Sequence, residues 1–193
     1  MYGLRASING HSSDVRCLIS CNNPMGGGFV TGARDKETKY WFPSGEGVGY
    51  DMLTNFRGAT HWISSLCYME PDADNINGFI IAGCFDNKIR IYDPLSSEAK
   101  ALLVGHSETV CSLAVNNSTQ TIVSGSWDKS VKVWKGDWGS AEKKCIRTVS
   151  DVHGGSVLTI VIMDDDSFIT GCADKLIRHF DAKDIWIKNY IFQ

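Results

Sequence analysis

The sequence lacks several features that would place the protein in a specialised class. Its strongest apolar run, residues 157–163, has seven residues and includes a threonine, far short of the roughly 20 that cross a membrane. Lys and Arg total 19 against 22 for Asp and Glu, so the chain has no basic surplus of the kind that binds nucleic acid. The amino terminus has neither a cationic start before an apolar stretch nor a small-residue cleavage site, which predicts no secretory signal. We therefore expect a cytoplasmic and nuclear protein that binds neither membrane nor nucleic acid.

The cysteine pattern argues against a disulfide framework. There are seven cysteines, an odd number, and none forms a C-x-x-C motif. Three of them recur inside apolar segments, and Cys84 and Cys172 stand where a matching segment has Ser126. This pattern predicts free thiols on small, buried side chains.

What the sequence does contain is the composition of a folded domain with an internal repeat. Hydrophobic residues make up 43% and charged residues 21% of the 193 residues, close to globular averages. The clearest repeat unit is residues 105–135, and its outline returns at 10–42, 58–93 and 152–181. The apolar residues that open the four copies lie 48, 47 and 47 residues apart, namely Val15, Ile63, Val110 and Val157. A fixed period of this length predicts a repeat architecture.

Each copy has the pattern of β-strands. Short runs rich in Val, Ile and Cys alternate with polar residues, as at 89–92 and 131–134, and turn residues separate the runs. No stretch has helical spacing over ten or more residues. Each copy therefore predicts four strands, which form one blade of a β-propeller. The expected blade units are 10–57, 58–104, 105–149 and 152–192, with outer strands at 50–57, 99–104, 144–149 and 186–192 and a spare outer strand at 2–9.

The copies resemble WD-repeat β-propellers. The signature set of that family is a His, a Ser or Thr, an Asp and a Trp. It is complete in two copies, as His11, Thr31, Asp35 and Trp41 and as His106, Ser124, Asp128 and Trp134. The fourth copy has His153, Thr170 and Asp174 followed by Phe180, and the second keeps only Asp86. The resemblance implies an all-β fold in which four blades are present, as the first part of a seven-bladed propeller.

The recurrence of His, Ser and Asp invites interpretation as a hydrolase. A nucleophile needs a base within hydrogen-bond reach and an exposed site for a carbonyl group. Because the set recurs blade after blade, buried hydrogen bonds that fix a turn are the better interpretation. The acidic run of residues 164–166 lies in a turn, where solvated carboxylates are more common than a metal site. We expect no catalytic residue, no cofactor and no metal.

The order of the copies carries a closer resemblance. The segments GHSSDVRCL, FVTGARDKETKYWF, IIAGCFDNKIRIYD and SGSWDKSVKVWK follow one another as in the family of phospholipase A-2-activating proteins, over about residues 4–182. Members of this family are ubiquitin-binding cofactors of an AAA-type unfoldase. The resemblance implies a non-enzymatic, ubiquitin-binding propeller that acts in ubiquitin-dependent protein turnover. It also implies that the unfoldase is contacted through regions absent from this chain.

The same resemblance places the ubiquitin site on one face of the propeller, at the start of each inner strand and in the turn before each Asp. The candidate residues are Asp14, Arg16, Trp62, Thr109 and Ser156 in the first set, and Arg34, Phe85, Trp127 and Ala173 in the second. Exposed aromatic and Arg side chains are common anchors of interfaces, and Asp14 is expected to meet the basic surroundings of the apolar patch of ubiquitin.

Alternatives remain open at this stage. Packing against the next blade is an equal interpretation for Phe85 and Trp127, and a solvated carboxylate is one for Asp14. The alternative function is a generic WD-repeat scaffold that binds a different peptide or subunit, and composition and repeats alone do not separate the two.

Overall fold

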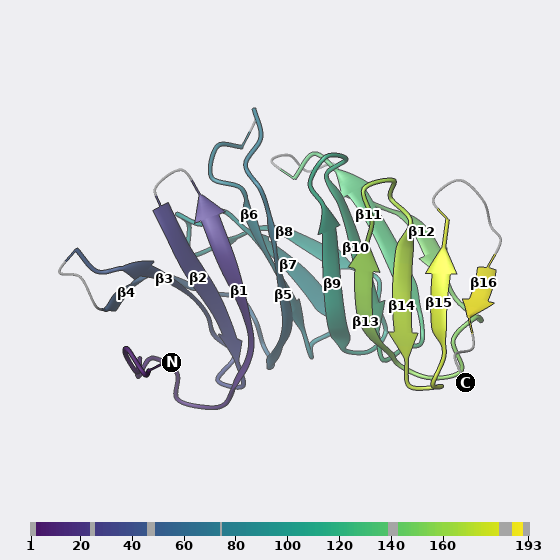
Figure 1. The fold of residues 1–193 in the computed structure, drawn as a ribbon, viewed down its shortest axis with the longest axis horizontal. Helices are drawn as coiled ribbons and strands as arrows, with labels where there is room; N and C mark the ends of the chain where they lie inside the picture. Colours follow the sequence, from purple (N-terminus) through teal and green to yellow (C-terminus); the bar gives the residue numbers. More distant parts are fainter. Residues whose placement is uncertain are drawn as a thin grey trace.

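The computed structural model of the chain describes residues 3–23, 26–45, 49–73, 75–138, 143–181 and 187–190. Within these residues the backbone forms sixteen strands and no helix, arranged as four antiparallel sheets of four strands each (Figure 1). The predicted all-β fold with four blades is confirmed. None of the described residues forms a helix that could span a membrane.

Each sheet consists of four strands that are consecutive in the chain and pair in order, and we refer to the sheets as blades 1 to 4. Blade 1 contains β1 (Val15–Asn23), β2 (Gly26–Ala33), β3 (Thr38–Pro43) and β4 (Tyr50–Phe56). Blade 2 contains β5 (Ile63–Met69), β6 (Phe79–Cys84), β7 (Lys88–Tyr92) and β8 (Ala99–Val104). Blade 3 contains β9 (Val110–Asn116), β10 (Thr121–Ser126), β11 (Val131–Gly136) and β12 (Lys143–Val149). Blade 4 contains β13 (Val157–Ile162), β14 (Phe168–Cys172), β15 (Ile177–Phe180) and β16 (Ile187–Tyr190).

The blades stand side by side in chain order. In Figure 1 they run from purple to yellow, with blade 1 and blade 4 at opposite ends of the row. The innermost strands β1, β5, β9 and β13 are neighbours in succession. Three clusters of buried side chains, one for each pair of neighbouring blades, fill the space between the sheets and form the core. The alternating apolar residues of the strands thus meet between blades, as sheet-on-sheet packing requires.

A bulge and a tight turn recur in every blade and shape the end where the candidate site lies. The pairing register shifts after the first residue of each inner strand, at Val15, Ile63, Val110 and Val157, which bends the strand there. The turn between the second and third strands places a residue in the left-handed region of backbone conformation, with φ between 66° and 72°, at Lys36, Asn87, Lys129 and Lys175. In each case this residue directly follows the recurring Asp.

The cysteines behave largely as small buried side chains. All seven are free thiols, and Cys145 is the exposed exception. Cys84 and Cys172 take the place of Ser126, as expected, because all three donate a hydrogen bond to the same turn of their blade: to the carbonyl oxygens of His61 (3.1 Å), Gly155 (3.2 Å) and Glu108 (3.0 Å), respectively. Burial raises the pKa of Cys84 to about 11, so its thiol keeps the proton that it donates.

The spare outer strand predicted at residues 2–9 has no pairing partner among the described strands, so it stays a prediction. Residues 3–10 have no regular secondary structure, and residues 1 and 2 lie outside the described part of the chain. A strand is stabilised by hydrogen bonds to a neighbouring strand, and none of the sixteen described strands pairs with this segment.

Candidate functional site

Blades 1 and 3 each contain a hydrogen-bonded network built from the recurring set. In blade 3, His106 Nδ1 lies 2.8 Å from Asp128 Oδ2 and His106 Nε2 lies 2.8 Å from Ser124 Oγ. The indole Nε1–H of Trp134 donates to the same Ser124 oxygen at 2.8 Å. Blade 1 repeats the arrangement with His11, Asp35, Thr31 and Trp41, at 2.8, 2.7 and 2.8 Å.

This network has the geometry of a structural element. Ser124 is completely buried and already bonded to two partners, so its hydroxyl has no open side on which a carbonyl group could be placed. Burial lowers the pKa of His106, although Asp128 beside it acts in the opposite direction. Burial alone would raise the pKa of Asp128, but hydrogen bonds from Ser130 and His106 lower it overall. The set therefore ties the second and third strands of the blade, the turn between them and the segment before the inner strand together with satisfied polar groups.

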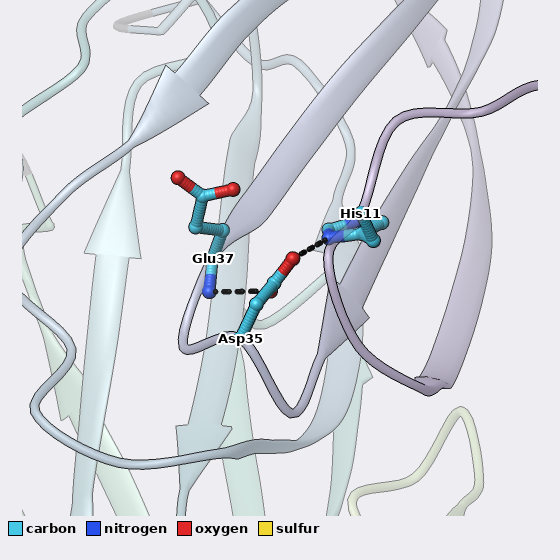
Figure 2. A group of neighbouring side chains, drawn as sticks. All are labelled: His11, Asp35 and Glu37. Carbon is cyan, nitrogen blue, oxygen red and sulfur yellow. Dashed lines mark hydrogen bonds and ion pairs between the residues drawn. The ribbon is translucent and has the colours of Figure 1, made fainter.

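One group of described side chains has the spacing of a metal site. The ligand atoms of His11, Asp35 and Glu37 lie within 4.8 Å of one another. Figure 2 shows Asp35 facing the ring of His11, while the carboxylate of Glu37 turns away from both. That carboxylate lies 2.6 Å from Lys39 Nζ, and Asp35 also accepts from the backbone N–H of Ser12 at 3.0 Å. Because the oxygen ligands already have protein partners, we assign the group to the blade 1 network.

The acidic turn of residues 164–166 is more than a solvated loop. Asp166 Oδ1 accepts hydrogen bonds from Asn116 Nδ2 at 2.8 Å and from Thr119 Oγ1 at 2.6 Å. Its other oxygen lies 3.5 Å from Lys135 Nζ. The expectation that these carboxylates are only solvated is thus wrong for Asp166, which joins blade 4 to blade 3.

Blades 2 and 4 use a second kind of network that the sequence interpretation missed. Asp86 forms a two-point ion pair with Arg90, at 3.0 and 2.7 Å, and Asp174 forms the same pair with Arg178. Both Arg side chains are buried. The signal is present in the sequence: an Arg follows the Asp by four residues in the two copies that lack the complete set, where the other two copies have Lys.

The second network leaves a histidine with one unpaired nitrogen. His153 keeps its hydrogen bond to Thr170 at 3.0 Å, but its buried Nδ1 has no partner among the described residues. The reason is that Asp174 faces Arg178 and the backbone N–H of Gly154 instead. Burial, followed by the charge of Arg178, lowers the pKa of His153.

We expect the melting temperature to fall when the pH is lowered from about 7.5 to about 5.5. His106 and His153 have lowered pKa values in the folded state, whereas histidine in an unfolded chain has a pKa of about 6.5. The unfolded state therefore takes up protons first, and stability present above that pKa is lost as the pH falls towards the folded pKa. Thermal unfolding followed by circular dichroism measures this effect. His153→Gln should reduce the difference between the two pH values, and an unchanged melting temperature of the parent would contradict the prediction.

The predicted partner-binding residues lie at one end of the blades, where the inner strand begins and the second strand ends. Apart from Arg16, each residue of the first set pairs with one residue of the second through a backbone hydrogen bond. The donors and acceptors are Arg34 N to Asp14 O (2.9 Å), Phe85 N to Trp62 O (2.9 Å), Trp127 N to Thr109 O (3.0 Å) and Ala173 N to Ser156 O (2.9 Å). The repeat thus brings equivalent positions of all four blades to the same end of the row.

Five of these side chains touch in one continuous series across blades 1 to 3. Arg34 lies 3.1 Å from Asp14 Oδ2, and its guanidinium sits 4.3 Å above the ring centre of Trp62. The ring centre of Trp62 is 5.1 Å from that of Phe85, which is 5.1 Å from that of Trp127 in an edge-on arrangement. We call this series the rim, consisting of Asp14, Arg34, Trp62, Phe85 and Trp127.

The rim is open to solvent and includes a neighbour that sequence reasoning did not single out. Trp127 is 41% exposed, and the side chains of Asp14 and Arg34 are 58% and 38% exposed. His61 stacks on Phe85 at 5.6 Å and accepts a hydrogen bond from the backbone N–H of Trp62. Its only signal in the sequence is its position directly before Trp62, two residues before the start of β5.

The remaining candidates of this face lie outside the rim and stay predictions. Thr109 is buried, and its backbone carbonyl accepts the hydrogen bond from the N–H of Trp127. Arg16 is exposed at the bulge of β1, and Ser156 lies in blade 4 opposite Ala173, which has no ring to extend the series. Asp14 is not a lone carboxylate, because Arg34 pairs with it.

Comparisons with known proteins follow the same repeat. The profile of the family described as "WD domain, G-beta repeat" matches residues 3–41, 51–93, 97–135 and 143–181. The chain is 34% identical to phospholipase A-2-activating protein of Xenopus laevis, over 85% of this chain and 20% of that protein. It is 29% identical to the ubiquitin fusion degradation protein 3 homolog of Caenorhabditis elegans, over 92% of this chain and 20% of that protein. It is 30% identical to the ubiquitin homeostasis protein lub1 of Schizosaccharomyces pombe, over 69% of this chain and 18% of that protein.

These matches confirm the resemblance that the order of the motifs predicted. The chain spans about a fifth of the length of these relatives. The four profile matches together cover most of its residues. Each contains one copy of the repeat, and the last three begin at the outer strand of the preceding blade, namely β4, β8 and β12. The chain therefore belongs to the WD domain, G-beta repeat family.

Proposed function

We propose that the rim binds ubiquitin and that the chain is the ubiquitin-binding part of a cofactor in ubiquitin-dependent protein turnover. The observation that carries the proposal is a series of aromatic rings in contact with one another, with a charged pair at one end. Two similar proteins have ubiquitin in their names, the degradation protein 3 homolog and the homeostasis protein lub1. WD-repeat propellers with exposed loop residues of this kind are suited to recognising other proteins.

The physical fit rests on the order within the rim. Trp and Arg side chains are the most frequent anchors of protein interfaces, and here each ring is held by its neighbours before any partner arrives. Such preorganisation lowers the entropy lost on binding. Ubiquitin offers an apolar patch with basic surroundings, so the rings of Trp62, Phe85 and Trp127 would cover the patch. Asp14 would face the basic edge while it remains paired with Arg34.

The proposed role involves binding without catalysis. The hydroxyl groups of Thr31, Ser124 and Thr170 each form a hydrogen bond with the histidine of their own blade, as part of a structural network. An AAA-type unfoldase is the proposed further partner, reached through segments outside this chain. Cytoplasm and nucleus are the proposed locations, and neither nucleic acid nor membrane is a proposed partner.

We expect Trp127→Ala to weaken ubiquitin binding by about tenfold or more, as loss of an anchor side chain does. The measurement is a titration of isotope-labelled ubiquitin with the unlabelled chain, followed by NMR chemical shifts. The matched control is Ile76→Ala, because Ile76 is 70% exposed but lies between β5 and β6, at the opposite end of these strands. The control should bind as the parent does.

To test the charged end of the rim, a substitution that neutralises Asp14 is more informative than one that reverses its charge. An Arg at position 14 would place a second cation beside Arg34 and Trp62, so a loss of binding would have two causes. Asp14→Asn removes the charge and keeps the shape, and we expect a smaller loss than with Trp127→Ala. No shifts with a folded parent would mean that the rim serves another partner. Shifts that persist unchanged in Trp127→Ala would place the ubiquitin site elsewhere.

A further inference from the structure

His61 supports two rings of the rim and is itself exposed to solvent. Its ring centre lies 5.0 Å from that of Trp62 and 5.6 Å from that of Phe85, and the planes of His61 and Phe85 are nearly parallel at 19°. Its backbone carbonyl accepts a hydrogen bond from the thiol of Cys84, which keeps its proton because burial raises its pKa to about 11. The backbone of His61 is thus fixed to blade 2, while its ring contacts both the rim and the solvent.

The hydrogen bond of the ring shows which of its nitrogens carries a proton. The backbone N–H of Trp62 lies with its nitrogen 2.9 Å from His61 Nδ1. A backbone N–H only donates, so Nδ1 is the acceptor and carries no proton. The arrangement therefore requires the neutral ring with its proton on Nε2. A histidine that takes up a second proton has donors on both nitrogens, and the hydrogen bond from Trp62 is then lost.

The charged groups around His61 do not favour a positive ring. Trp62 already has a cation on its ring, because the guanidinium of Arg34 lies 4.3 Å from the ring centre. The carboxylates of the adjoining turns have other partners: Asp14 pairs with Arg34, and Asp86 belongs to the buried two-point ion pair of blade 2. None of the ion pairs among the described residues includes His61. A charge on His61 would therefore add to the positive charge beside Trp62.

We propose that His61 is a positioning residue of the rim and makes the binding of ubiquitin depend on pH. The inference rests on the proposed function of the rim. A neutral His61 holds the Trp62 backbone and stacks on Phe85, so two anchor rings are in place before the partner arrives. A charged His61 loses the hydrogen bond and brings a like charge towards the basic surroundings of the ubiquitin patch. Binding therefore weakens as the pH falls through the range of about 8 to 5, in which histidine becomes charged.

The test compares the affinity for isotope-labelled ubiquitin at about pH 7.5 and about pH 5.5 by NMR titration. We expect the parent to bind about threefold or more weakly at the lower pH, because apparent affinity falls with the fraction of competent molecules. His61→Gln should show a much smaller difference, since Gln does not become charged. The matched control is His179→Gln in β15 of blade 4, which should keep the difference of the parent. Any titration of ubiquitin itself is common to the three chains, and circular dichroism checks that each is folded at both pH values.

A second measurement needs no ubiquitin and separates the inference from the proposed function. In the isotope-labelled chain, the backbone amide proton of Trp62 should move upfield at the lower pH as its hydrogen bond is lost, and it should stay in place in His61→Gln. An unchanged Trp62 signal in the parent would overturn the inference even if ubiquitin binds. Equal pH dependence of affinity in the parent and His61→Gln would overturn it as well. A Trp62 signal that moves without ubiquitin binding at either pH would refute the proposed function and support the positioning role of His61.

Discussion

Asp86→Ala is expected to lower the free energy of unfolding by about 3–5 kcal/mol, the usual cost of leaving one charge of a buried pair without its partner. The side chains of Asp86 and Arg90 are only 9% and 5% exposed, and two hydrogen bonds of 3.0 and 2.7 Å join them. The variant would leave the guanidinium of Arg90 inside blade 2 with its main acceptor removed. Urea unfolding followed by circular dichroism gives the difference from the parent.

The exposed ion pair of the same protein is the matched control. Asp14 and Arg34 lie 3.1 Å apart, but their side chains are 58% and 38% exposed. Exposed pairs contribute about 0–1 kcal/mol, so Asp14→Ala should change the free energy of unfolding little. Similar losses in the two variants would contradict the assignment of the Asp86–Arg90 pair as a buried structural element.

Trp134→Ala is expected to lower the free energy of unfolding by about 3–5 kcal/mol, as the loss of a large buried aromatic side chain does. Trp134 is 3% exposed and belongs to the apolar cluster between blades 2 and 3. It also donates the 2.8 Å hydrogen bond to Ser124, so its removal leaves both a cavity and a missing donor in the blade 3 network.

A second tryptophan of the same blade, Trp127, is expected to contribute little to the free energy of unfolding. Trp127 lies seven residues earlier in the chain, in the turn after β10, and is 41% exposed. Trp127→Ala should unfold close to the parent and lose affinity for ubiquitin, whereas Trp134→Ala should lose stability first. The same urea experiment covers both variants. If Trp127→Ala were as unstable as Trp134→Ala, the rim would be part of the core and its assignment as a binding surface would fail.

The repeat made most of the fold predictable. A period of about 47 residues with strand-like alternation fixed four blades of four strands. The observed outer strands β4, β8 and β12 begin and end within one residue of the predicted ranges, and β16, at 187–190, lies inside its predicted range of 186–192. This works because each blade must bury both faces of its sheet against its neighbours, which forces the same alternation in every copy. The segment at 2–9 shows the limit of this argument, because none of the described strands pairs with residues 3–9.

The site was predictable in position and not in its contacts. The bulge of the inner strand and the turn after the second strand place Trp62, Phe85 and Trp127 at one end of the blades. The alignment of the four copies in the sequence already indicates this position. The stacking of Arg34 on Trp62 and the burial of Thr109 depend on the distance between neighbouring blades. The repeat pattern of the sequence does not predict the distance between neighbouring blades. The Asp86–Arg90 pair was missed because the signature set of His, Ser or Thr, Asp and Trp describes only the blades that contain it. It gives no information on a blade in which another pair of residues takes its place.

The two kinds of network also bear on how such a chain can change over generations. Each network joins residues of a single blade: His106 reaches Asp128 and Ser124, and Arg90 reaches Asp86. Replacing one kind by the other requires substitutions in that blade alone, and the stability of a repeat protein is approximately the sum of its units and their contacts. The blades can thus diverge one at a time, while the shared turn geometry keeps the rim end of each blade in place.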